Sequence, residues 1–217
     1  MFNVTQVGSW PRSKRTLDAL DARRAGKMTR AEFDRVADDE VRRTVEFQVE
    51  ADVDIVVDGE HRRDSFVSFV TEKVDGTELV AVEDTSDGQA DFDEMLEAAD
   101  VKRGTIRNPV CVGTLSRREP LAVDEFEFVK TITDRPVKIP LPGPYLLVRS
   151  MWSPKYSKKD YPNPTDMAND VVDILREELI ELRNAGCEFV QFDEPVLTEV
   201  VHTGEDLEGE SFSRTFM

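Results

Sequence analysis

The chain has 217 residues, of which 39% are hydrophobic and 34% charged, which is enough apolar material for one sizeable core and too little for two comfortable domains. Its formal net charge of -17 argues against nucleic acid and against an anionic membrane surface as partners, because both select a basic face. Two cysteines without a CxxC motif, a polar N-terminus and the lack of a long apolar run predict one cytoplasmic domain over residues 1–217. The acidic composition suits a high-salt cytoplasm, where charge repulsion is screened.

Two patterns alternate along the chain. Short apolar runs that end in Gly, Pro, Ser or Asp predict strands, and charged stretches with apolar residues every three or four positions predict helices. The predicted strands are Val4–Ser9, Val53–Asp58, Val110–Leu115, Val137–Leu141 and Phe189–Asp193. The predicted helices lie near residues 12–25, 28–52, 124–133 and 165–185.

Capping signals support two of these helices. Thr29 and Glu32 form the sequence signature of a capping box, and Thr165 and Gly186 are the expected start and stop of the last helix. Residues 71–100 carry turn residues and alternation, which indicate a short hairpin or another excursion from the main pattern.

Strand and helix in steady alternation predict parallel strands joined by right-handed crossovers. The two candidate folds are an open doubly wound sheet and a closed barrel. No GxGxxG turn follows the first strand, and the chain contains no P-loop. Polar residues at several strand ends favour the barrel, so the predicted fold is α/β of the (β/α)8 TIM-barrel type, incomplete here, with about the first five βα units.

Four strand ends carry the polar residues. The first ends in "VGSWPR", the second in "DGEHRRD", the fourth in "LPGP" and the fifth in "QFDEP". In a barrel these ends surround one mouth, so Ser9, Glu60, Asp193 and Glu194 are expected to converge on a single pocket. Each residue also has a simpler interpretation, as a turn at Ser9, a solvated helix start at Glu60 and a plain turn before Pro195.

In order and spacing, these motifs resemble the catalytic barrel of the cobalamin-independent methionine synthase family in its core, single-barrel form. The resemblance covers nearly the whole chain. It implies that the chain corresponds to the N-terminal portion of that barrel. It implies a homocysteine S-methyltransferase that makes methionine. It places homocysteine on Val7, Gly8, Ser9, Glu60 and Asp193, and the methyl donor on Arg107, Trp152 and Glu199. These residue types suit an amino acid as ligand. Its α-ammonium group would pair with the carboxylates of Glu60 and Asp193, and its α-carboxylate would accept from the backbone N–H groups of Gly8 and Ser9.

The resemblance also implies a zinc ion that binds and deprotonates the homocysteine thiol, held in part by a His-x-Cys motif. This chain has no such motif, and Cys111 and Cys187 are expected to be small core residues, with His61 and His202 at the surface. Metal ligands and catalytic residues are therefore expected downstream of this chain, which alone is expected to be inactive. Its open barrel edges would favour self-association.

Three questions remain open from the sequence. The donor is methyltetrahydrofolate or methylcobalamin, the second of which implies a corrinoid protein as partner. A related zinc-thiol alkyl transferase that acts on another thiol is an alternative function. A non-catalytic barrel fragment that binds a small amino acid or a partner chain is another.

Overall fold

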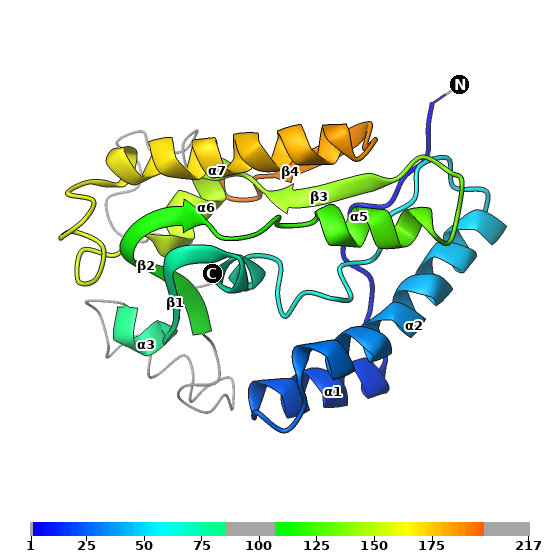
Figure 1. Cartoon of the computed structure of the whole chain (residues 1–217), viewed down its shortest axis with the longest axis horizontal. Helices are drawn as coiled ribbons and strands as arrows, with labels where there is room; N and C mark the ends of the chain where they lie inside the picture. The colour runs from blue at the N-terminus through cyan, green and yellow to red at the C-terminus, as the bar shows by residue number, and fades with distance from the viewer. Residues whose placement is uncertain (1, 86–106, 198–217) are drawn as a thin grey trace, which may run out of the picture. The chain divides into compact units, whose positions relative to one another are not determined.

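The computed structural model describes residues 2–85 and 107–197 (Figure 1). In chain order the helices and strands are α1 Lys14–Arg24, α2 Arg30–Glu50, the 3-10 helix η1 Ser68–Glu72, β1 Val74–Ala81, α3 Val82–Thr85, β2 Arg107–Arg117, α5 Val123–Lys130, β3 Lys138–Pro142, α6 Pro144–Met151, α7 Pro164–Asn184 and β4 Phe189–Asp193. They divide between two compact units. The first comprises Met1–Phe66, Pro120–Leu141 and Arg176–Phe192, and the second comprises Val67–Glu119, Pro142–Leu175 and Asp193–Met217. The single-domain expectation stays a prediction.

Helices α1 and α2 of the first unit pack against each other (Figure 1). Their buried contact consists of Ala19, Leu20, Phe33 and Ala37. The predicted capping box at the start of α2 is confirmed, because Thr29 accepts from the Glu32 N–H while the Glu32 carboxylate accepts from the Thr29 N–H at 2.8 Å. These bonds satisfy two amides that a helix start otherwise leaves without partners.

Parallel strand contacts lie at the centre of the first unit. Thr5 pairs with Ile55 and Val56 pairs with Val137, both in parallel bridges. β3 and β4 form a two-stranded sheet. They run in the same direction, because Cys187 lies beside Val137 at their starts and the Gly143 N–H donates to the Asp193 carbonyl at their ends. The α/β class is therefore confirmed, but the described residues contain only two two-stranded sheets and two isolated bridges.

A side chain replaces part of the strand pairing near Val57. Gln48 of α2 accepts from the Val57 N–H at 3.0 Å and donates to the Val57 carbonyl at 2.8 Å. The glutamine amide thus satisfies both backbone groups of a fully buried residue. This explains why the predicted strand Val53–Asp58 has only the two bridged residues.

The start of α5 is capped from a distant part of the chain. Ala122 in the N-cap position offers no side-chain oxygen. Instead the buried Glu178 carboxylate accepts from the Leu121 N–H at 2.6 Å and from the Ala122 N–H at 2.7 Å. A carboxylate at this position also opposes the positive end of the helix dipole.

The prediction of Val110–Leu115 as a third parallel strand is wrong. β2 pairs antiparallel with β1 in the second unit, in a register that runs from Val74↔Arg117 to Ala81↔Arg107. The register shifts at Gly76, whose φ is +79°, and a Cβ there would lie 2.4 Å from the Thr114 carbonyl oxygen. The hairpin is therefore an excursion outside the parallel strand contacts, and the segment 110–115 is not one of the parallel strands.

The N-cap of α7 also differs from the prediction. The helix begins at Pro164, and the Asn163 side chain accepts from the Asp166 N–H at 3.0 Å. Thr165 therefore lies inside the first turn. Proline at the first helical position has no N–H to satisfy, which favours this start. Gly186 follows the helix with φ of +95°, as the sequence predicts. None of the helices in the described ranges combines the length and apolar character needed to cross a bilayer.

Candidate functional site

Gly8 lies where two predicted site segments meet in the first unit. It is buried, and a Cβ at this position would lie 2.6 Å from Glu60 Oε1 and 3.0 Å from Pro140 Cγ. The missing side chain is what lets the Glu60 carboxylate approach the backbone of this turn. Ser9 beside it is exposed, and the Val7 carbonyl accepts from Gln191 Nε2 at 2.9 Å. The structure thus brings together Gly8 and Glu60, two of the residues expected to bind the amino acid.

Glu60 is buried and has an unusual backbone. Its exposed fraction is 3%, and its φ of +59° lies in the left-handed region, next to Gly59 at +78°. A left-handed non-glycine residue costs about 1–3 kcal/mol, so the surrounding contacts must fix it. Glu60 therefore does not belong to a solvated helix start, which was the simpler interpretation of the charged run.

Two side chains hold the backbone of Glu60. Its N–H donates to Asp58 Oδ1 at 3.0 Å, and its carbonyl accepts from Arg12 Nη2 at 3.2 Å. The same Arg12 nitrogen donates to the Arg63 carbonyl at 2.8 Å. Burial lowers the pKa of the Arg12 guanidinium, whereas the nearby Glu60 charge acts in the opposite direction. The turn after the first strand is thus bonded to the turn that carries Glu60.

Arg63, which follows the turn that carries Glu60, forms a buried ion pair with Glu125. Arg63 is 1% exposed and donates to both Glu125 oxygens, with Nη2 2.6 Å from Oε2, and to the Pro140 carbonyl at 2.9 Å. Burial alone would lower the pKa of Arg63, but the Glu125 carboxylate raises it above the ordinary value. Burial raises the pKa of Glu125, and the bonds from Arg63 tie the loop after Glu60 to the end of β3 and to α5.

His61 is buried rather than at the surface as expected. Its exposed fraction is 0%, and Nε2 lies 2.8 Å from Thr44 Oγ1 of α2. Burial lowers the pKa of His61 to about 4, so the imidazole is neutral near pH 7. The side chain therefore packs the Glu60 turn against α2.

Asp193 and Glu194, at the end of β4 in the second unit, differ in their contacts. Glu194 Oε1 accepts from the Tyr145 N–H at 2.7 Å, and Oε2 accepts from the Leu146 N–H at 2.8 Å. A Cβ on Gly143 would lie 2.1 Å from Glu194 Oε1. Glu194 therefore caps α6, and Gly143 makes room for it. Asp193 is the last residue of β4 and its side chain is half-buried.

The residues expected to bind the methyl donor are described only in part. Arg107 is the exposed first residue of β2, and Trp152 follows α6 with its indole Nε1 donating to the Tyr161 carbonyl at 3.1 Å. Glu199 lies outside the described residues. The expected roles of Arg107 and Trp152 stay predictions.

The described cysteine and histidine side chains do not form a zinc site. Cys111 and Cys187 are buried, and burial raises the pKa of both thiols. Within the described ranges, no three His, Cys, Asp or Glu side chains are grouped as metal ligands. The residues present here therefore do not fit the zinc ion that the resemblance implies.

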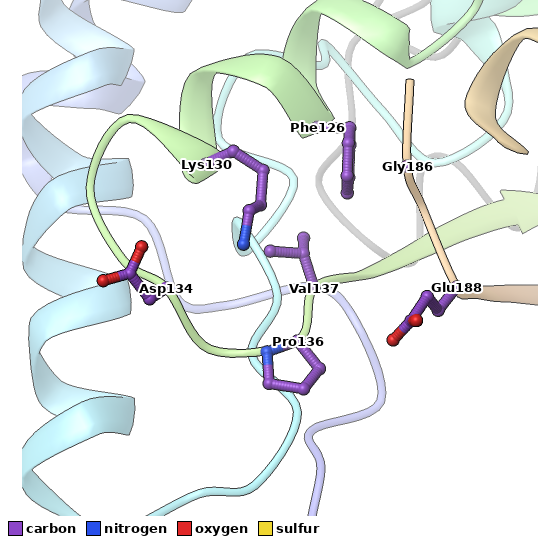
Figure 2. A pocket seen from close by; sticks show the side chains of 7 residues that line it. All are labelled: Phe126, Lys130, Asp134, Pro136, Val137, Gly186 and Glu188. Atoms are coloured by element: carbon purple, nitrogen blue, oxygen red, sulfur yellow. The ribbon is translucent and has the colours of Figure 1, made fainter. Parts of the chain in front are cut away.

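A surface pocket of about 270 Å³ lies elsewhere in the first unit (Figure 2). Figure 2 shows Phe126 and Lys130 projecting from α5 towards the segment that leads into β3. The lining residues are Phe126, Lys130, Asp134, Pro136, Val137, Gly186 and Glu188. They precede β3 and β4, so the pocket is at the N-terminal ends of these strands and contains none of the predicted site residues.

Two curated relatives match most of this chain. A methionine synthase from Saccharolobus solfataricus is 32% identical over 202 residues, which cover 91% of this chain and 54% of the relative. The 5-methyltetrahydropteroyltriglutamate–homocysteine methyltransferase of Streptomyces griseus is 32% identical over 203 residues, 93% of this chain and 24% of the relative. The chain thus spans between a quarter and about half of the length of these curated relatives.

Solved structures show the same likeness. The B12-independent methionine synthase from Shewanella sp. W3-18-1, in complex with selenomethionine, has a TM-score of 0.65 and 25% identity over 93% of this chain and 55% of that protein. A Listeria monocytogenes protein at 19% identity and a TM-score of 0.63, over 94% of this chain and 63% of its own length, supports the fold alone.

The family described as "Cobalamin-independent synthase, Catalytic domain" matches residues 2–215. That description does not support methylcobalamin or a corrinoid protein, which the sequence had left open. With nearly the full length matched, the chain belongs to the cobalamin-independent methionine synthase family.

Proposed function

We propose that this chain forms the amino-acid-binding part of a (β/α)8-type catalytic barrel that transfers a methyl group to the thiol of homocysteine and produces methionine. The observation that carries the proposal is the buried Glu60 carboxylate, held against the glycine turn of the first strand. The names of the relatives support the reaction. The selenomethionine in the Shewanella protein supports the ligand class, since selenomethionine shares the α-amino and α-carboxylate groups of methionine.

The proposed contacts follow from charge. Glu60 and Asp193 accept hydrogen bonds from the α-ammonium group of homocysteine. Charge-assisted hydrogen bonds of this kind are stronger than neutral ones, so they compete well with hydration of the ammonium group in a partly buried site. The backbone N–H groups of Gly8 and Ser9 donate to its α-carboxylate, and Val7 completes this turn.

The proposed methyl donor is a folate, 5-methyltetrahydropteroyltriglutamate, as the names of the curated relatives indicate. Arg107, Trp152 and Glu199 are its proposed contacts. An arginine suits the glutamate carboxylates of such a donor, and an indole ring suits its flat pterin. Because the described residues do not fit a zinc site, we expect the chain alone to transfer no methyl group.

Calorimetric titration of the chain with L-homocysteine and L-methionine tests the proposal. Glu60→Gln and Asp193→Asn should each weaken binding about tenfold or more, because each removes the charge that pairs with the ammonium group. Asp134→Asn, an exposed carboxylate outside the site, is the matched control and should leave the affinity unchanged. Binding that is insensitive to both site variants would contradict the assignment.

A further inference from the structure

We propose that Arg12 and Asp58 are positioning residues that hold Glu60 in its left-handed conformation, so that its carboxylate stays against Gly8 and is ready for the substrate's ammonium group. This inference rests on the proposed function and adds two residues to it. Neither residue is required to touch the substrate.

The geometry supplies one side chain for each backbone group of Glu60. Asp58 Oδ1 receives the Glu60 N–H at 3.0 Å, and Arg12 Nη2 donates to the Glu60 carbonyl at 3.2 Å. The Glu60 carbonyl also accepts from the Arg63 N–H at 3.2 Å, which closes the turn. A residue at φ of +59° relaxes unless its peptide groups are held, and here both peptide groups are held.

The same bonds fix the distance between the two turns of the site. The Trp10 N–H donates to the Gly59 carbonyl at 3.0 Å, and Arg12 bridges the carbonyls of Glu60 and Arg63. Both donors follow directly after the Gly8 turn in sequence. Loss of the Arg12 bridge would therefore let the Glu60 carboxylate move relative to the turn that is proposed to bind the substrate's carboxylate.

Electrostatics and positioning predict opposite results at Arg12. If Arg12 acted only through its charge, its removal would strengthen the attraction between Glu60 and an ammonium group. If it positions Glu60, its removal weakens binding of that group. The variant Arg12→Met, which keeps an apolar stem of similar length, separates these two effects.

Asp58 needs a different control, because a positioning role and a direct charge contact both predict weaker ammonium binding when the Asp58 side chain is removed. Asp58 is 1% exposed, and its Oδ2 has no hydrogen-bond partner among the described residues, so a direct contact with the ligand is the competing explanation. Asp58→Asn retains an oxygen for the Glu60 N–H and removes the charge. Asp58→Ala removes both.

The experiment measures binding of L-homocysteine and of its deamino analogue, 4-mercaptobutanoate, to the full chain and to each variant. Asp58→Ala and Arg12→Met should weaken homocysteine binding roughly five- to tenfold, and Asp58→Asn should stay within about twofold of the unchanged chain. Binding of the analogue should not change, since it has no ammonium group. Far-UV circular dichroism melting curves establish that each variant is folded.

Each outcome has one meaning. An equal loss in Asp58→Asn and Asp58→Ala, stronger binding in Arg12→Met, or an equal loss for both ligands would overturn the positioning role. A variant that does not fold would show a general structural role and would also overturn it. If the unchanged chain binds homocysteine no better than the analogue, or if Glu60→Gln has no effect, the proposed function itself fails.

Discussion

Removal of the Glu178 carboxylate should destabilise the chain more than removal of any exposed acid. Glu178 is 0% exposed, and its two oxygens accept from the N–H groups of Leu121 and Ala122, which are themselves buried. In Glu178→Ala both donors lose their partner inside the protein. A buried donor without a partner costs about 1–3 kcal/mol, so for two donors the expected loss in the free energy of unfolding is about 2–6 kcal/mol.

The assay is thermal and urea unfolding followed by far-UV circular dichroism. For a chain of this length, a loss near 3 kcal/mol corresponds to a fall in Tm of roughly 6–12 °C. Glu178→Gln keeps the shape but offers one oxygen to two donors and turns an NH2 group towards an N–H group. It should fall between the alanine variant and the unchanged chain, at about 1–3 kcal/mol.

Glu188→Ala is the matched control, because Glu188 is an exposed glutamate of the same unit and its loss should stay within about 0.5 kcal/mol. The proposed role of the two Glu178 hydrogen bonds is refuted if Glu178→Ala is as stable as this control. It is also refuted if Glu178→Gln matches the unchanged chain, since the loss in the alanine variant would then come from packing and not from the two hydrogen bonds.

The pKa of His61 is lowered to about 4 in the folded state, so its contribution to stability is present above pH 6.5 and is lost as the pH falls towards 4. Over this range the free energy of unfolding, measured by urea unfolding, should fall by about 3 kcal/mol less in His61→Asn than in the unchanged chain, and parallel curves would contradict this. Gly8→Ala should displace the Glu60 carboxylate and weaken homocysteine binding, whereas Gly113→Ala, where a Cβ meets only an ordinary contact at 3.7 Å, should bind normally; equal affinities in a titration would show that position 8 has room. With a formal net charge of -17, the chain should gain in Tm as KCl rises from about 0.1 M to 1 M, because the screening length falls from about 10 Å to 3 Å, and a Tm that does not rise would argue against charge repulsion.

Short sequence patterns predict those structural features whose contacts lie between residues close together in the sequence. The capping box of Thr29 and Glu32 matches the structure because it depends on residues within a few positions, and the bounds of Phe189–Asp193 match although this strand pairs with the distant β3. The contact between Gly8 and Glu60 could also be predicted, since parallel strands bring their C-terminal ends together.

The errors come from partners that local sequence does not specify. The run "VCVG" in β2 has the apolar character of a parallel core strand, but its pairing with β1 in an antiparallel hairpin depends on residues about 35 positions away. Arg63 and Glu125 are separated by 62 positions, so their pairing left no signal in the charged run "EHRRD". The start of α7 is different, because it can be predicted from local sequence: proline favours the first helical position, so Pro164 indicates that Asn163 is the N-cap.

The carboxylates that cap α5 and α6 have a consequence for the order in which the chain can fold. Glu178 follows Leu121 by 57 positions and Glu194 follows Tyr145 by 49, so each helix is synthesised long before the residue that satisfies its first amides. Until then water must solvate these N–H groups, and an eight-residue helix is marginal in water. Hydrogen exchange at α5 in a chain ended at Leu175 would show open amides, and protection there would refute this order. During synthesis, the two helices therefore acquire their final stability only after Glu178 and Glu194 have emerged.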